Sequence, residues 1–260
     1  MRKINIITAT FILGCSLIGL QSCTKEGAQG PTGNQGPIGA AGPALKGTLA
    51  GYVLLFDQYG SRLLTSMANV MVTIDNIHDT TYTDSTGKYE FQNLSTGLYN
   101  LTYQKTGFGT NSVFSQQFTG GGLYFRNDIR ISSIPNFNVL GVRDSLTATD
   151  AFILDSVAPN SKQRSQIVFI GATPSVSANP TTYLDYMTKN INVNVSKSVI
   201  DIPFSDIINL GFVSGQTVYI ASYGICTNFS NSSVYEDYLT GRLIFSSISS
   251  VPATTSFVLP

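Results

Sequence analysis

The sequence predicts an all-β protein with two antiparallel β-sandwich domains in tandem, placed behind a leader segment and an extended tether. Short β-prone runs recur along residues 45–260 and are separated by turns rich in Gly, Asn and Asp, as expected of sandwiches. Only 12% of the residues are charged, and Trp is absent. This uncharged polar composition is typical of secreted β-rich proteins rather than of helical cytosolic enzymes.

The first 22 residues have the organisation of a secretory signal. Arg2 and Lys3 give a positive start, an apolar stretch runs from Ile4 to Leu20, and the small residue Ser22 precedes Cys23. The apolar stretch is too short and too polar for a permanent membrane span. We therefore expect residues 1–22 to be removed as a signal peptide.

The end of this leader resembles the lipobox of bacterial lipoproteins, which has an aliphatic residue, a variable residue, a small residue and then Cys. Leu20, Ser22 and Cys23 fit this pattern, while Gln21 is bulkier and more polar than the usual occupant. The resemblance implies that Cys23 becomes the first mature residue and carries diacylglycerol. Several acyl chains, at about 0.8 kcal/mol per buried CH₂, would hold the chain on a membrane. The alternative is an ordinary secretory signal followed by a coincidental cysteine.

The residues after Cys23 indicate where a lipoprotein would be displayed. Thr24-Lys25-Glu26 lacks the Asp that disfavours outer-membrane sorting, and a Lys followed by an acid resembles the surface-export signals of Bacteroidetes lipoproteins. Those signals usually have two acids, whereas this chain has one. The expected location is the bacterial outer membrane, lipid-anchored, at the cell surface.

Glycine then recurs at every third position from Gly27 to Gly42, so residues 27–44 form Gly-X-Y triplets. Because only glycine fits at the axis of a collagen triple helix, this period is the signature of collagen. One interpretation is a short trimerising stalk. The other is a single polyproline-II tether, about 3.1 Å per residue or roughly 55 Å long. Together with the lipidated cysteine, residues 23–44 form the predicted spacer.

Residues 45–133 are predicted to form the first sandwich. Strands are expected over residues 45–56, 70–74, 80–83, 88–91, 98–105, 111–118 and 123–131. Asp84 and Gly87 bracket a tight turn between two of them.

A set of residues in this sandwich has a recognisable arrangement, and it resembles the carboxypeptidase regulatory-like family. The resemblance implies a prealbumin-like sandwich in a noncatalytic spacer, packing module or binding surface. Related surface sandwiches form a Lys–Asn crosslink assisted by a buried acid, but the matching position here is Tyr103, so we expect no crosslink. The residues that carry the resemblance are Gly51, Val53, Val70, Val72, Ile74, Thr83, Asp84, Gly87, Lys88, Tyr89, Phe91, Leu94, Gly97, Tyr99, Leu101, Lys105, Gly107 and Phe108.

Residues 134–260 are predicted to form a second β-sandwich, which loosely resembles fibronectin-III or immunoglobulin-like domains. We expect strands over residues 138–142, 148–154, 166–173, 191–202, 217–227, 241–249 and 255–259. Short helical turns are expected over residues 182–189 and 204–210.

Candidate functional residues other than Cys23 fall into two groups. Tyr219 and Tyr223 share one strand face and Tyr235 follows nearby, which is a candidate ligand platform for a glycan; the alternative is core packing. Four hydroxyl residues follow an Asp in a pattern that resembles the O-glycosylation acceptor of Bacteroidetes, although Asp-Ser and Asp-Thr also occur in ordinary turns. These four are Thr80, Ser85, Ser145 and Ser156.

The remaining composition restricts the chemistry. His78 is the only histidine, so a conventional serine triad cannot be built, and we predict no catalytic, cofactor-binding or metal-binding residue. The formal net charge of zero gives no reason to expect a nucleic-acid partner. With Cys15 in the leader and Cys23 lipidated, Cys226 is predicted to be a buried strand thiol. The sequence therefore predicts a noncatalytic binding, adhesion or structural module with a glycan or protein ligand. The alternative is a hydrolase or glycan-processing accessory protein that uses residues 134–260.

Overall fold

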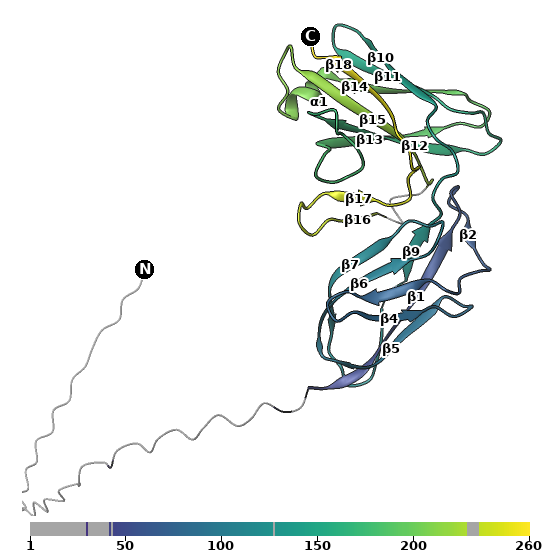
Figure 1. Cartoon of the computed structure of the whole chain (residues 1–260), viewed down its shortest axis with the longest axis vertical. Helices are drawn as coiled ribbons and strands as arrows, with labels where there is room; N and C mark the ends of the chain where they lie inside the picture. The colour runs from purple at the N-terminus through teal and green to yellow at the C-terminus, as the bar shows by residue number, and fades with distance from the viewer. Residues whose placement is uncertain (1–29, 31–41, 43, 127, 228–233) are drawn as a thin grey trace, which may run out of the picture. The chain divides into compact units, whose positions relative to one another are not determined.

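The structure is a computed structural model that describes residues 30, 42, 44–126, 128–227 and 234–260. The predicted signal peptide, Cys23 and most of the Gly-X-Y segment lie outside the described residues. The chain divides into two units, residues 1–42 and 43–260, and all the secondary structure described belongs to the second. The described residues of that unit form eighteen strands and one short helix, which confirms the predicted all-β class (Figure 1).

The N-terminal half, residues 44–133, has two sheets around one apolar core. In the first sheet, β1 pairs antiparallel with β2 and β5 and parallel with β8 and β9; the second has the order β4-β3-β6-β7. The strands are β1 (Lys46–Phe56), β2 (Arg62–Leu63), β3 (Met71–Ile74), β4 (Asp79–Tyr82), β5 (Lys88–Ser95), β6 (Gly97–Gln104), β7 (Asn111–Phe118), β8 (Leu123–Phe125) and β9 (Ile129–Ser132).

Alternation of side chains along these strands builds the core. Val72 and Ile74 of β3 are fully buried, as the alternating sequence predicts. Tyr103 is also fully buried, and its hydroxyl lies 2.9 Å from that of Tyr89, so each buried phenol has a partner. Burial raises the pKa of both hydroxyls. Tyr103 is therefore part of a neutral hydrogen-bonded pair.

The predicted turn after β4 depends on Gly87. Its φ is +86°, and a Cβ there would lie 2.5 Å from the Val53 carbonyl oxygen. Both the backbone conformation and the lack of space therefore require glycine. Asp84 Oδ1 accepts the N–H groups of Thr86 and Lys88 at 2.8 and 3.0 Å. This Asx-type turn sets the start of β5.

The C-terminal half, residues 134–260, has a four-stranded sheet of order β13-β12-β15-β18 and a three-stranded sheet of order β10-β11-β14. An apolar core separates them, and a hairpin of β16 and β17 follows β15. The elements are β10 (Gly141–Leu146), β11 (Asp150–Ser156), β12 (Arg164–Gly171), β13 (Asp185–Ile191), β14 (Lys197–Pro203), α1 (Phe204–Asn209), β15 (Thr217–Ile225), β16 (Val234–Glu236), β17 (Leu243–Phe245) and β18 (Ala253–Val258).

A second apolar layer covers the other face of the four-stranded sheet. Phe169 of β12 and Tyr223 of β15 pack there against Phe245 of β17 and against Val176 and Tyr183 of the loop between β12 and β13. All eight residues of β12 are consequently buried. We call this side of the sheet its outer face.

Two local predictions for this half were wrong. Residues 182–189 do not form a helical turn, because Asp185–Ile191 pairs residue by residue with β12 as the edge strand β13. The strand expected over residues 191–202 is interrupted at Asn194, whose φ is +58°, and β14 begins only at Lys197. The helical turn expected over residues 204–210 is confirmed by α1.

Hydrogen bonds connect the two halves. Ser247 Oγ donates to the Ser132 carbonyl at 2.7 Å, and the Thr227 N–H donates to the Gln58 carbonyl at 2.9 Å. The division into separate domains at residues 133 and 134 stays a prediction.

Candidate functional site

Tyr219 lies near the start of β15 and borders a cavity of about 330 Å³. Its side chain points to the outer face of the sheet, where it joins the second apolar layer. The Tyr219 cavity is lined by Ala172, Leu184, Leu210, Gly211, Phe212, Gln216, Thr217 and Tyr219.

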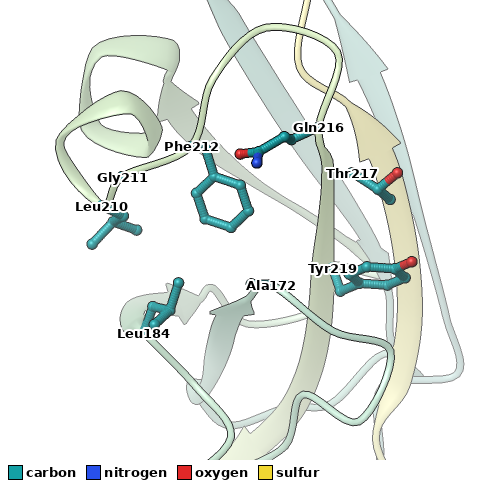
Figure 2. A pocket seen from close by; sticks show the side chains of 8 residues that line it. All are labelled: Ala172, Leu184, Leu210, Gly211, Phe212, Gln216, Thr217 and Tyr219. Carbon is teal, nitrogen blue, oxygen red and sulfur yellow. The ribbon is translucent and has the colours of Figure 1, made fainter.

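The apolar part of the Tyr219 cavity comes from two separate connections. Leu210 and Phe212 follow α1, and Leu184 ends the loop before β13; Figure 2 shows the Phe212 ring between Leu184, Leu210 and Gln216. Phe212 is only 4% exposed, so it is fixed in the core while it forms part of the cavity wall. Gly211, with a φ of +97°, turns the chain between Leu210 and Phe212.

Three polar side chains complete the lining. Gln216 Oε1 accepts the Val213 N–H at 2.9 Å, which fixes the amide and leaves its NH₂ group as the donor end. Thr217 and Tyr219 are half-buried and line the cavity from β15, and Figure 2 shows their hydroxyl groups on the side of the strand away from Phe212. Backbone hydrogen bonds hold this corner, since the Gly215 N–H donates to the Leu259 carbonyl at 2.8 Å and the Leu259 N–H donates to the Gln216 carbonyl at 2.9 Å.

A second hollow of about 360 Å³ also uses Tyr219 as a wall. We call it the β18 hollow, because three of its residues belong to that strand. Pairing in register places Ser256 opposite Tyr219 and Thr254 opposite Ala221, so these side chains share the outer face. The β18 hollow is lined by Pro174, Val176, Tyr219, Ile220, Thr254, Thr255 and Ser256.

The loop between β12 and β13 forms one side of both hollows and is held tightly. A Cβ at Gly171 would lie 2.7 Å from Val176 Cγ2 and 2.9 Å from the Thr182 carbonyl oxygen, so only glycine lets the loop fold back onto β12. The Leu184 N–H donates to the Ile170 carbonyl at 2.7 Å and returns the chain to the sheet. The site therefore has prearranged walls.

None of the described residues that line these two hollows is charged. Within the described part of the chain, no group of three His, Cys, Asp or Glu side chains is placed to hold a metal ion. The arrangement can supply apolar contact, an aromatic ring, hydroxyl groups and one amide. These groups suit an uncharged ligand that has both an apolar surface and hydroxyl groups.

A larger hollow of about 540 Å³ lies where β11 and α1 begin and includes Thr149, Asp150 and Ser205. The Thr149 hydroxyl donates to the Asp150 carboxylate, and the Asp150 N–H donates to Thr147 Oγ1 at 3.0 Å. The Asp150 carboxylate is thus engaged in the local turn, and Asp150 is the one acidic side chain among the described residues lining this hollow.

The structure does not bring Tyr219, Tyr223 and Tyr235 together on one exposed surface. Tyr223 is 6% exposed and packs edge-to-face on Phe169, so core packing describes it better than a platform. Tyr235 of β16 packs on Phe114 of β7 with ring centroids 6.4 Å apart, and burial raises the pKa of its hydroxyl. Of the three, Tyr219 alone borders the two hollows described above.

The other sequence-predicted site residues lie elsewhere. Thr80, Ser85, Ser145 and Ser156 are all exposed, so their hydroxyl groups are accessible for modification. Cys23 lies outside the described residues. Cys226 is fully buried in the second apolar layer.

Sequence reasoning missed most of the Tyr219 cavity. Leu184, Phe212 and Gln216 come from different connections, and no motif or spacing in the sequence joins them. The signal that the sequence did contain was the spacing of Tyr219 and Tyr223, which places both on one face of a predicted strand.

A buried polar cluster lies between the two sheets of the C-terminal half. Asp155 of β11 is 1% exposed, and its Oδ2 accepts the Gln166 Nε2–H at 2.7 Å. Burial raises the pKa of Asp155 to about 6, while Ser222 and Gln166 lower it. The Ser222 hydroxyl lies near the Asp155 carboxylate without forming a hydrogen bond to it. Ser222 Oγ, Asp155 Oδ1 and Gln166 Oε1 each lack a hydrogen-bond partner among the described residues.

No helix among the described residues has the length and apolar character needed to cross a membrane.

No family model matches the chain, and neither does any curated protein. Similar solved structures include DUF3823 family proteins from Bacteroides ovatus (13% identity, 83% of this chain and 100% of that chain, TM-score 0.32) and Bacteroides uniformis (12%, 84% and 100%, 0.30). The full-length major pilin of Corynebacterium diphtheriae is also similar (12%, 76% and 63%, 0.24). Scores this low carry no argument about fold or function, so the likeness to the regulatory-like family stays a sequence resemblance.

Proposed function

We propose that this chain is a noncatalytic binding module, held at the cell surface by lipid on Cys23, and that the Tyr219 cavity is its ligand site. One observation carries the assignment of the site. The cavity combines the apolar surface of Phe212 with the amide of Gln216, and no charged side chain is among the described residues lining it. Such a lining favours an uncharged ligand.

The anchor is proposed from the leader and from the Gly-X-Y segment behind it. A tether of roughly 55 Å would separate the folded part from the bilayer if residues 27–44 are extended. Trimerisation through the same triplets is the other arrangement, and the mass of the detergent-solubilised protein distinguishes the two.

Fractionation of cells that express the full chain tests the anchor. Cys23→Ser is expected to block lipidation and move the protein out of the membrane fraction, whereas the neighbouring Thr24→Ser is expected to leave it there. Unchanged membrane partitioning and maturation of Cys23→Ser would contradict the proposal. Protease added to intact cells tests surface display, and full protection of residues 45–260 would contradict it.

Ligand binding is tested by screening the purified full chain against uncharged glycans and purified proteins. For any ligand found, Tyr219→Ala is expected to weaken binding by at least about tenfold, because it removes a wall of the cavity. Tyr82→Ala, at a site 60% exposed in the N-terminal half, is the matched control and should bind like wild type. Equal binding by wild type and Tyr219→Ala would refute this site.

The enzyme alternative required paired carboxylates in a cleft of residues 134–260. The described residues lining the Tyr219 cavity and the β18 hollow include no acidic side chain, and those of the larger hollow include one. No observation in the described structure favours hydrolysis, and we do not propose it.

A further inference from the structure

The two hollows at Tyr219 share this one aromatic side chain in their linings. The Tyr219 cavity, about 330 Å³, and the β18 hollow, about 360 Å³, have Tyr219 as their common lining residue. A ligand that occupied both would therefore pass over or beside the phenol ring. Such a ligand would have to be long enough to span both hollows.

The strand register arranges hydroxyl groups along the same path. Thr217 and Tyr219 of β15 are two residues apart and face the same side, and Ser256 stands directly opposite Tyr219 on β18. Thr254, two residues before Ser256, continues the row on the edge strand. Both β18 residues are exposed, so their hydroxyl groups face the ligand side rather than the core.

The two hollows differ in the chemistry they offer. The Tyr219 cavity has the buried Phe212 and the fixed Gln216 amide, so it can contact an apolar ring face and donate hydrogen bonds at its rim. The β18 hollow has the Pro174 ring and Val176 on one side and the Thr254 and Ser256 hydroxyls on the other. Each hollow pairs an apolar wall with uncharged polar side chains.

Sugar rings match this repeat, because each unit has an apolar C–H face and a rim of hydroxyl groups. Neither hollow has a charged residue among its described lining, which disfavours acidic saccharides and charged peptides. We propose that the site binds an uncharged oligosaccharide of at least two units, with one unit in each hollow. This inference depends on the proposed binding function and specifies its ligand class.

Chain-length dependence tests the inference on the purified full chain. The probes are glucose, mannose and N-acetylglucosamine, each with its di- and trisaccharides, and binding is followed by isothermal titration calorimetry. For the sugar that binds, the disaccharide is expected to bind about tenfold more tightly than the monosaccharide, because it fills a second prearranged hollow. Tyr219→Ala is expected to weaken both.

Variants in β18 separate the two hollows. Ser256→Gln places a longer side chain in the β18 hollow and is expected to lower the ratio of disaccharide to monosaccharide affinity from about ten to about one. Val258→Gln, on the same edge strand, opposite Thr217 and outside both linings, is the matched control and should keep the gain. Ser256 and Val258 are both exposed, so neither change disturbs the core.

The outcomes distinguish failure of the two-unit inference from failure of the proposed binding function. If monosaccharides bind at Tyr219 but the second unit adds nothing, or if Ser256→Gln keeps the gain, the two-unit inference is overturned and the proposed function stands. If no probe of the panel binds while the screen yields a protein or other ligand sensitive to Tyr219→Ala, the saccharide class is overturned. If neither set gives a Tyr219-dependent ligand, the proposed function falls as well.

Discussion

Replacing Asp155 with asparagine is expected to stabilise the protein at neutral pH and to remove part of its pH dependence. Asp155 is 1% exposed and lies between two sheets, where Gln166 supplies one hydrogen bond. Burial raises its pKa from 3.8 to about 6. A shift of about 2 units corresponds to about 3 kcal/mol of unfavourable free energy for the ionised folded state.

The direction follows from proton linkage. The folded state binds the Asp155 proton more tightly than the unfolded state, so the free energy of unfolding falls as pH rises from about 4 to about 6 and is constant above that range. The group is protonated in both states below that range, where wild type and Asp155→Asn should be close in stability. The charged hydrogen bond from Gln166 is already included in the net shift. We therefore expect a difference of up to about 3 kcal/mol at pH 7.

Urea unfolding between pH 4 and pH 8, followed by far-ultraviolet circular dichroism because Trp is absent, measures this difference. The difference between the two proteins isolates Asp155 from exposed acids such as Asp84 and Glu90, whose lowered pKa values give the opposite trend. Asp79→Asn, an exposed site, is the control. An Asp155→Asn protein that is less stable than wild type at pH 8, or a difference independent of pH, would refute the reasoning.

Two further predictions concern the N-terminal half. Gly87→Ala should destabilise it by about 2–3 kcal/mol, because φ is +86° and the new Cβ would lie 2.5 Å from the Val53 carbonyl oxygen; Gly107→Ala, with φ +81° and open space, should show only about 1 kcal/mol of backbone strain. Thr83→Val should lose about 2–4 kcal/mol, because it leaves the Val70 N–H and the Met67 carbonyl without the buried hydroxyl that bonds both, at 2.9 and 2.7 Å. Urea unfolding measures both sets, and equal effects of the two glycine changes or a neutral Thr83→Val would contradict them.

Strand β3 of the N-terminal half could be predicted because its signal is local, whereas the single strand expected over residues 123–131 is divided into β8 and β9. Val70, Val72 and Ile74 alternate with the half-buried Met71 and Thr73, and β3 has the corresponding face buried. The turn at Gly87 was predictable for the same reason, since an Asp and a Gly at this spacing define the chain reversal by themselves. Signals of this kind need no knowledge of the partner strand.

The misassigned segments depend on distant partners. Asp185–Ile191 has little alternation, and it becomes a strand because β12 offers a row of backbone groups to pair with. The interruption at Asn194 likewise has no strong local signal, since Asn tolerates a positive φ without requiring it. Tertiary pairing decides both cases.

The position of the candidate site follows from how far the second apolar layer extends along β15. Tyr219, Ala221 and Tyr223 all face outward, but the β12–β13 loop and the β16–β17 hairpin cover the middle of the strand and bury Tyr223. That cover ends near the start of β15, where Tyr219 is only half-buried and the chain after α1 supplies Phe212. Side chains on the same face of a strand can therefore belong either to the core or to the candidate site, depending on whether a loop covers them. A sequence pattern of period two predicts only the face of the sheet on which a side chain lies and not the loops that cover it. For this reason it predicted Tyr219 and Tyr223 as one platform.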